Sequence, residues 1–162
     1  MKIDIARQPL VPAFMTLFAL AVAAMCAGIP VSDTSGAVRD ALPLLGGQLA
    51  RFQAAYPVWS KFAAGFMLLF TGMCAGRITI RYNLYTVGTC LPIPLYAIVA
   101  CGIATGGNYL AGFAASMLLA LATKNYCRAF CNGYGFDAIF RASLYLGLMP
   151  LVYAPALPLL LL

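Results

Sequence analysis

Long apolar runs with charged residues only at or near their ends are the feature that most constrains this chain. The first, LVPAFMTLFALAVAAMCAGI at 10–29, has about the length that crosses the hydrocarbon core of a bilayer. Backbone polar groups in lipid must be satisfied within their own segment, so such runs predict helices. Further runs place spans near 59–76, 84–103, 109–123 and 142–162. We therefore expect an all-α, multi-pass transmembrane protein of about five spans, forming a single integral membrane domain over 1–162.

The composition supports lipid as the solvent. Hydrophobic residues make up 64% of the chain and charged residues 9%, which leaves too little polar surface to cover a soluble globule. The net charge is +6, and in a soluble protein this excess would suggest a nucleic-acid partner. Here the cations lie at the ends of apolar runs, where they contact lipid headgroups. We expect membrane lipids as partners and no nucleic acid.

The first run has two interpretations. Lys2 and Arg7 precede it, and the small residues near its end resemble a weak signal-peptide cleavage site. The run is long for the apolar part of a signal peptide, and Cys26 lacks the usual lipobox residues before it. We therefore interpret 10–29 as an uncleaved first span.

The segment between the first two spans has an amphipathic pattern. Apolar residues recur in it at spacings of three or four, and most polar residues fall elsewhere on the helical wheel. The apolar positions are Val38, Leu42, Leu45, Leu49, Phe52 and Tyr56. The pattern predicts an interfacial helix on the membrane surface or, equally, a helix packed against the spans.

Proline and glycine mark the connections in the second half. Pro92 and Pro94 each remove a backbone donor, so the third span should kink or start late. The link TGGN at 105–108 is short enough to make the third and fourth spans an antiparallel hairpin. The last run stops at Leu162 without a polar flank, so we expect a chain truncated at this end.

Basic residues in alternate connections predict the orientation. With the N-terminus inside, Arg39, Arg51 and Lys61 lie outside. Seven others lie inside, namely Lys2, Arg7, Arg77, Arg81, Lys124, Arg128 and Arg141. Seven against three favours a cytoplasmic N-terminus for a protein of the cell membrane.

The polar stretch KNYCRAFCNGYGFD at 124–137 is interpreted as the cytoplasmic connection between the fourth and fifth spans. Cys127 and Cys131 are four apart, which would place them on one face of a helix. Zinc normally needs four ligands, or three and a water, and the chain has no histidine. We therefore expect no metal here, and we expect Asp137 to mark a helix start.

Asp33, in PVSDTSG, is the first carboxylate after the first span and the candidate catalytic residue. At the outer surface it could act as a general base or bind a divalent cation near a lipid-linked substrate. The simpler interpretation, favoured by sequence, is that it stabilises the turn DTSG.

Arg77 and Arg81 are the candidate residues for binding a phosphate or a lipid headgroup, because guanidinium groups suit bidentate contacts with anions. Holding their connection on the cytoplasmic side of the membrane is their simpler role, and the two roles are compatible. The sequence contains no Walker loop, dinucleotide fingerprint, nucleophile elbow or HExxH motif, and we expect no cofactor. No span centre carries an acid or a histidine, so a proton-coupled transport relay has no visible parts.

Two glycine pairs have the four-residue spacing that lets helices approach closely: Gly72 with Gly76, and Gly102 with Gly106. We expect Gly72 and Gly76 to seat the third span against the second. The pairs could also mediate association with another membrane subunit or with a second copy.

The last stretch, FDAIFRASLYLGLMPLVYAPALPLLLL, has an aromatic-led entry followed by small and apolar residues. Together with the order of spans, it resembles an uncharacterised family of polytopic inner-membrane proteins of Bacteroidota, whose pattern Tyr153 and Pro155 match. The resemblance implies a longer multi-pass protein and brings no catalytic residues with it.

A looser similarity is to polytopic glycosyltransferases that use lipid-phosphate sugar donors. These share the N-inside topology and an acidic residue soon after the first span, the place that Asp33 occupies. The chain lacks an acidic pair beside Asp33 and has a short outer loop and fewer spans, so the similarity implies at most a fragment of such an enzyme.

Three functions are therefore open. We expect an envelope-associated membrane protein without a catalytic centre of its own. The alternatives are a fragment of a glycosyltransferase-like enzyme acting on lipid-linked substrates, and a small transporter component.

Overall fold

The computed structural model describes residues 10–26, 44–82, 90–104, 108–131 and 135–161. Within these ranges every regular element is a helix, which confirms the all-α prediction. Six α-helices and a final 3-10 helix follow one another: α1 (Leu10–Cys26), α3 (Leu44–Ala55), α4 (Pro57–Arg81), α5 (Pro92–Ala104), α6 (Tyr109–Cys131), α7 (Phe136–Val152) and η1 (Ala154–Leu161).

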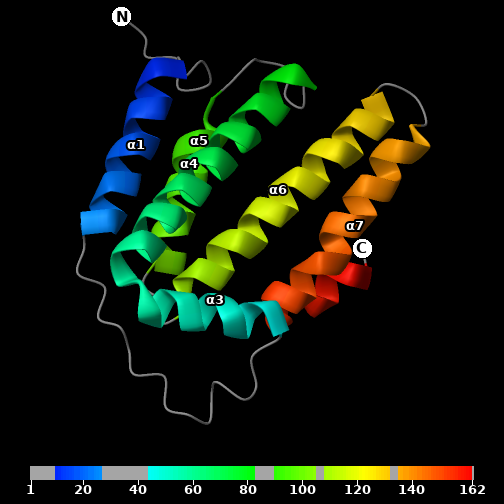
Figure 1. Cartoon of the computed structure of the whole chain (residues 1–162). Coiled ribbons are helices and arrows are strands. Elements are labelled where there is room, and N and C mark those ends of the chain that lie inside the picture. Colours follow the sequence, from blue (N-terminus) through cyan, green and yellow to red (C-terminus); the bar gives the residue numbers. More distant parts are fainter. Residues whose placement is uncertain (1–9, 27–43, 83–89, 105–107, 132–134, 162) are drawn as a thin grey trace, which may run out of the picture.

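The long helices α1, α4, α5, α6 and α7 lie side by side, and α3 runs across one end of the bundle (Figure 1). Helix α6 packs against α4 and α7, while α1 packs against α4 and α5. The C-terminal ends of α4 and α6 lie at the same end of the bundle as the starts of α1 and α7, and α3 closes the opposite end (Figure 1).

Helix α4 is longer than the predicted second span, 59–76. It begins with Pro57 at its first position, where the missing N–H costs nothing, and it continues through Arg77 to Arg81. Among the described residues it is the one helix long and apolar enough to cross a membrane, and α1 holds a shorter apolar stretch, Ala13–Ala23.

Helix α5 starts at Pro92, which confirms the late start expected from the two prolines. Proline is tolerated in the first turn of a helix because the N–H groups there have no intrahelical partner. Residues 83–89, in the first part of the predicted third span, lie outside the described residues.

The polar stretch at 124–137 is mostly helical, so its interpretation as a connection was wrong for its first part. Helix α6 continues through Lys124 to Cys131, and α7 begins at Phe136. Ala129 and Ala138 are buried, so the two helices remain packed at this end of the bundle. Asp137 lies in the first turn of α7, as expected for a helix start, and pairs with Arg141 at 3.0 Å.

The predicted last span, 142–162, begins earlier and is interrupted. Helix α7 starts at Phe136 and ends at Val152, Tyr153 is extended, and η1 follows. Pro155 and Pro158 lack the N–H groups that a continuous α-helix would need there.

Helix α3 is the described part of the predicted amphipathic helix; positions 38–43 lie outside the described residues. It packs against α4, α6 and α7, so the alternative of a helix packed on the spans holds. It buries one polar residue among those described, Gln53, whose Oε1 accepts a hydrogen bond of 3.5 Å from the backbone N–H of Leu110. That N–H is in the first turn of α6, where no carbonyl of the helix can reach it.

The glycine pair of α4 sets the distance to two neighbouring helices. A Cβ added at Gly72 would lie 2.7 Å from Leu17 Cδ2 of α1, and one added at Gly76 would lie 2.5 Å from Ile93 Cδ1 of α5. The expected seating of the third span on the second is therefore confirmed at Gly76. Gly102 belongs to α5, and Gly106 lies outside the described residues.

Candidate anion-binding groove

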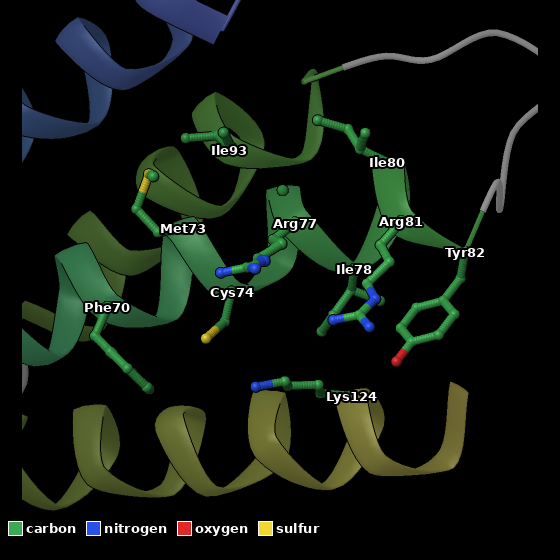
Figure 2. Close-up of a pocket in the computed structure, with 11 residues that line it drawn as sticks. Phe70, Met73, Cys74, Arg77, Ile78, Ile80, Arg81, Tyr82, Ile93 and Lys124 are labelled. Atoms are coloured by element: carbon green, nitrogen blue, oxygen red, sulfur yellow. The ribbon is translucent and has the colours of Figure 1, made fainter. Parts of the chain in front are cut away.

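A groove of about 770 Å³ opens between the C-terminal half of α4, the start of α5 and the middle of α6. Helix α4 supplies most of its wall, α5 supplies Ile93 and α6 supplies Lys124 (Figure 2). The side chains that line it are mainly apolar toward Phe70 and basic toward Arg81.

The two predicted anion-binding residues lie in this groove. Arg77 and Arg81 are four residues apart on α4, so they share a face of the helix, and both side chains are exposed. Neither forms a salt bridge with any residue that the structure describes. No described acid therefore competes with a ligand for either guanidinium group.

Lys124 is the third cation of the groove, and sequence analysis had assigned it only a role in topology. It comes from α6 and extends toward the face of α4 that carries Cys74 and Arg77 (Figure 2). Like the two arginines, it has no salt bridge among the described residues. No sequence signal identified it, because its place beside Arg77 depends on α4 and α6 packing together although α5 separates them in the chain.

The helix dipole accounts for only part of this clustering. Arg81 lies in the last turn of α4, where a cation is favoured by the unpaired carbonyl groups. Lys124 lies well before the last turn of α6, which ends at Cys131, so the dipole of its own helix gives no reason for its position. Three like charges on one groove repel one another unless an anion lies among them.

Tyr82, directly after α4, adds a hydroxyl to the basic end. Its backbone N–H donates to the Ile78 carbonyl oxygen at 3.1 Å, which keeps the residue against the last turn. Its hydroxyl points toward α6, on the same side as the guanidinium of Arg81 (Figure 2). The basic end thus offers guanidinium and phenol donors, and the Lys124 ammonium extends toward Cys74 (Figure 2).

The other end of the groove is apolar. Phe70 and Met73 precede Arg77 on α4, and Ile80 and Ile93 complete the wall. The groove can therefore bind an amphipathic ligand, with the anion at Arg77, Arg81 and Lys124 and an apolar chain along Phe70 and Met73. An acyl or isoprenoid lipid with a phosphate headgroup has this amphipathic structure.

Comparison with known proteins matched no family model, no curated protein and no solved structure.

The other candidate residues are Asp33 and the cysteine pair of α6. Asp33 is outside the described residues. Cys127 and Cys131 are on the last turns of α6, where Cys131 is exposed and Cys127 half-buried. Burial, and next the neighbouring Cys131, raise the pKa of the Cys127 thiol, so it is a poor thiolate ligand. In the part of the chain that the structure describes, no group of three potential metal ligands comes together.

Buried hydroxyl groups between the helices were not singled out by sequence analysis. Ser60 of α4 lies 2.6 Å from the hydroxyl of Tyr109 of α6. Similarly, the Tyr96 hydroxyl of α5 lies 3.1 Å from Ser116 Oγ of α6. Both pairs join neighbouring helices and have no ionised group, so we assign them to packing.

Proposed function

We propose that this chain is a multi-pass integral membrane protein, without a catalytic centre of its own, that holds the headgroup of an anionic lipid in the groove between α4, α5 and α6. The observation that carries the proposal is the convergence of Arg77, Arg81 and Lys124, unpaired with any described acid, on a groove that is otherwise apolar.

The outer surface of the bundle supports the membrane location. Large apolar side chains point away from the helix contacts, and Trp59 and Phe66 of α4 are 69% and 68% exposed. Others lie on the outer faces of the neighbouring helices: Phe14 and Phe18 of α1, Ile98 and Val99 of α5, and Phe140 and Leu144 of α7. A soluble monomer rarely exposes so extensive an apolar surface, whereas lipid solvates it at no cost.

The interior of the bundle also supports the membrane location. Many buried positions hold small residues: Ala13, Ala21, Ala64, Gly72, Gly76, Ala97, Ala100, Ala111, Ala115, Ala122 and Ala142. Small side chains at helix contacts and large ones outside are typical of helices that associate in lipid, where close van der Waals packing drives association.

Helix lengths and charges fit a bundle that crosses the membrane several times. Helices α1 and α7 have 17 residues each and α4 has 25, which fits the roughly 17–25 needed for a span. Helix α5, with 13 residues, and the part of α6 before Lys124, residues 109–123, are shorter. We assign the five proposed spans to α1, α4, α5, the part of α6 before Lys124, and α7. The end of the bundle that carries Arg81, Arg128 and Arg141 would then face the cytoplasm, in line with the distribution of basic residues.

The membrane location is tested by extraction. After alkaline carbonate treatment of cell membranes the chain should stay in the pellet, and detergent should release it. Release by carbonate alone would contradict an integral protein.

Headgroup binding is tested on the purified full chain in detergent, with phosphatidylglycerol as the anionic probe and phosphatidylcholine as the neutral one. Native mass spectrometry should show preferential binding of the anionic lipid. The double variant R77Q/R81Q should bind it about thirtyfold more weakly, because each cation near the headgroup contributes on the order of 1 kcal/mol and two are removed. R128Q is the matched control, since Arg128 is an exposed cation at the same end of the bundle but does not line the groove.

The same loss of binding free energy per removed charge in R77Q/R81Q and in R128Q would mean that the lipid responds only to overall charge, and the proposed site would fall. The glycosyltransferase-like and transporter interpretations gain no support from the residues that the structure describes.

A further inference from the structure

We propose that the groove selects a lipid that ends in a phosphate monoester or diphosphate over a lipid whose phosphate is a singly charged diester. This inference rests on the proposed headgroup function and names the class of ligand. It follows from the number and kind of the charged side chains that line the groove.

The charge balance of the lining favours a ligand with more than one negative charge. Arg77, Arg81 and Lys124 contribute three cations, and no carboxylate is among the described residues that line the groove. A phosphodiester headgroup has one negative charge and would leave most of the positive charge of the groove unbalanced. A terminal phosphate brings close to two at neutral pH, and a diphosphate brings more.

The donors match the same ligand class. A guanidinium group offers a fork of N–H donors to two oxygens of one phosphate, while an ammonium group acts as a point charge from another direction. A terminal phosphate has three unesterified oxygens for the arginines of α4, Lys124 of α6 and the Tyr82 hydroxyl. A diester has only two such oxygens, so it satisfies fewer of these donors.

The apolar wall identifies the ligand as a lipid and not as free phosphate. Phe70, Met73 and Arg77 follow one another along one face of α4, which places the apolar residues about 5–10 Å deeper along the helix than Arg77. A chain attached to the bound phosphate would therefore continue along Phe70 and Met73. Free phosphate would make none of these contacts.

A phosphate monoester also makes binding depend on pH in a way that a diester cannot. Its second ionisation falls near pH 6, so the dianion is lost as the pH decreases below this value. Among the described residues, the charged and titratable side chains that line the groove are Cys74, Arg77, Arg81 and Tyr82 from α4 and its end, and Lys124 from α6; the described lining from α5 is Ile93. The chain has no histidine, the side chain that ordinarily titrates between pH 5 and 8.

The test uses the purified full chain in detergent, titrated with phosphatidic acid or phosphatidylglycerol of the same acyl composition and followed by native mass spectrometry. At pH 7.5 phosphatidic acid should bind about fivefold more tightly, as expected for one additional ion pair. At pH 5.5 this preference should decrease to less than about twofold, because the second charge is then mostly protonated. Inorganic phosphate at the same concentration should not displace the bound lipid.

Variants separate this inference from the function on which it rests. K124Q should reduce the preference for phosphatidic acid while phosphatidylglycerol still binds, and R128Q should leave the preference intact. Circular dichroism of each variant checks the fold, and the substituted side chains are all exposed.

Equal binding of the two lipids, together with a loss of both in R77Q/R81Q, would overturn the selectivity and leave the headgroup function standing. Binding of both lipids that is insensitive to R77Q/R81Q would overturn both. Displacement of the lipid by inorganic phosphate would show that the apolar wall contributes nothing and would overturn the assignment of a lipid.

Discussion

The hydroxyl of Tyr109 lies 2.6 Å from Ser60 Oγ in the interior of the bundle and joins the start of α6 to the start of α4. Ser60 is 0% exposed, and its hydroxyl also donates to the Pro57 carbonyl oxygen at 2.8 Å. A hydroxyl has one hydrogen, so Tyr109 must donate and Ser60 accept. This pair fixes the relative position of the two helices that supply the cations of the groove.

Removing either member of this pair should destabilise the bundle, but by different amounts. Y109F leaves Ser60 bonded to Pro57 and should cost about 1 kcal/mol of unfolding free energy, a typical value for one hydrogen bond. S60A leaves a buried tyrosine hydroxyl without its partner and should cost about 1–3 kcal/mol. Unfolding in mixed detergent micelles measures the unfolding free energy of both variants. A double variant S60A/Y109F that is less stable than S60A alone would contradict this account.

Enlarging Gly76 should separate α4 from α5. A Cβ at this position would lie 2.5 Å from two atoms of Ile93, whose side chain is itself buried and has little room to move. G76A should therefore destabilise the protein by about 1–3 kcal/mol, the usual cost of overpacking. G147A in α7 is the matched control, because nothing lies within 4 Å of its added Cβ. It should be neutral or stabilising by up to about 1 kcal/mol, and thermal unfolding in detergent compares the two.

The two cysteines at the end of α6 should differ in their reactivity. Burial and the nearby Cys131 raise the pKa of Cys127, so at pH 7–8 it holds less thiolate and should react with iodoacetamide more slowly than the exposed Cys131. Trypsin separates them into the peptides NYCR and AFCNGYGFDAIFR, whose labelling is followed by mass spectrometry. Faster labelling of NYCR would show that the pKa of Cys127 is not raised.

The same pKa shift sets the sign of a pH effect on stability. Because the folded state holds the Cys127 proton more tightly than the unfolded state, its contribution to stability is present below the unfolded pKa, about 8.5, and is lost above it. Wild type should therefore lose more stability than C127S between pH 8 and pH 10. An identical decrease in both proteins would contradict the shift.

The proposed orientation predicts the side on which each connection lies. Reporter fusions after Asn83 and Asn132 should give a cytoplasmic signal, and a fusion after Gly36 should give a signal from the opposite side. The reason is that Arg77, Arg81, Lys124 and Arg128 adjoin the first two points and resist translocation. A signal from outside at Asn132 would reverse the orientation.

The sequence alone determined the helical class and much of the placement of the helices. The apolar runs require backbone hydrogen bonds within each segment, and Pro92 has to stand in a first turn, because both effects act within a few residues along the chain. Arg77 and Arg81 share one face of α4 because they are four residues apart, which is also a property of the local sequence. These two residues of the groove could therefore be predicted from their spacing.

Only the tertiary structure decided what lies opposite these residues. Lys124 lines the same groove as Arg77 because α4 and α6 pack together, and Gly72 contacts Leu17 because α1 packs on α4. Helix α6 likewise continues through the polar residues to Cys131, and Ala129 in this part is buried. The polarity of the neighbouring residues does not predict that burial. Contacts between helices depend on the shapes of both surfaces, and a single helix carries the shape of only one.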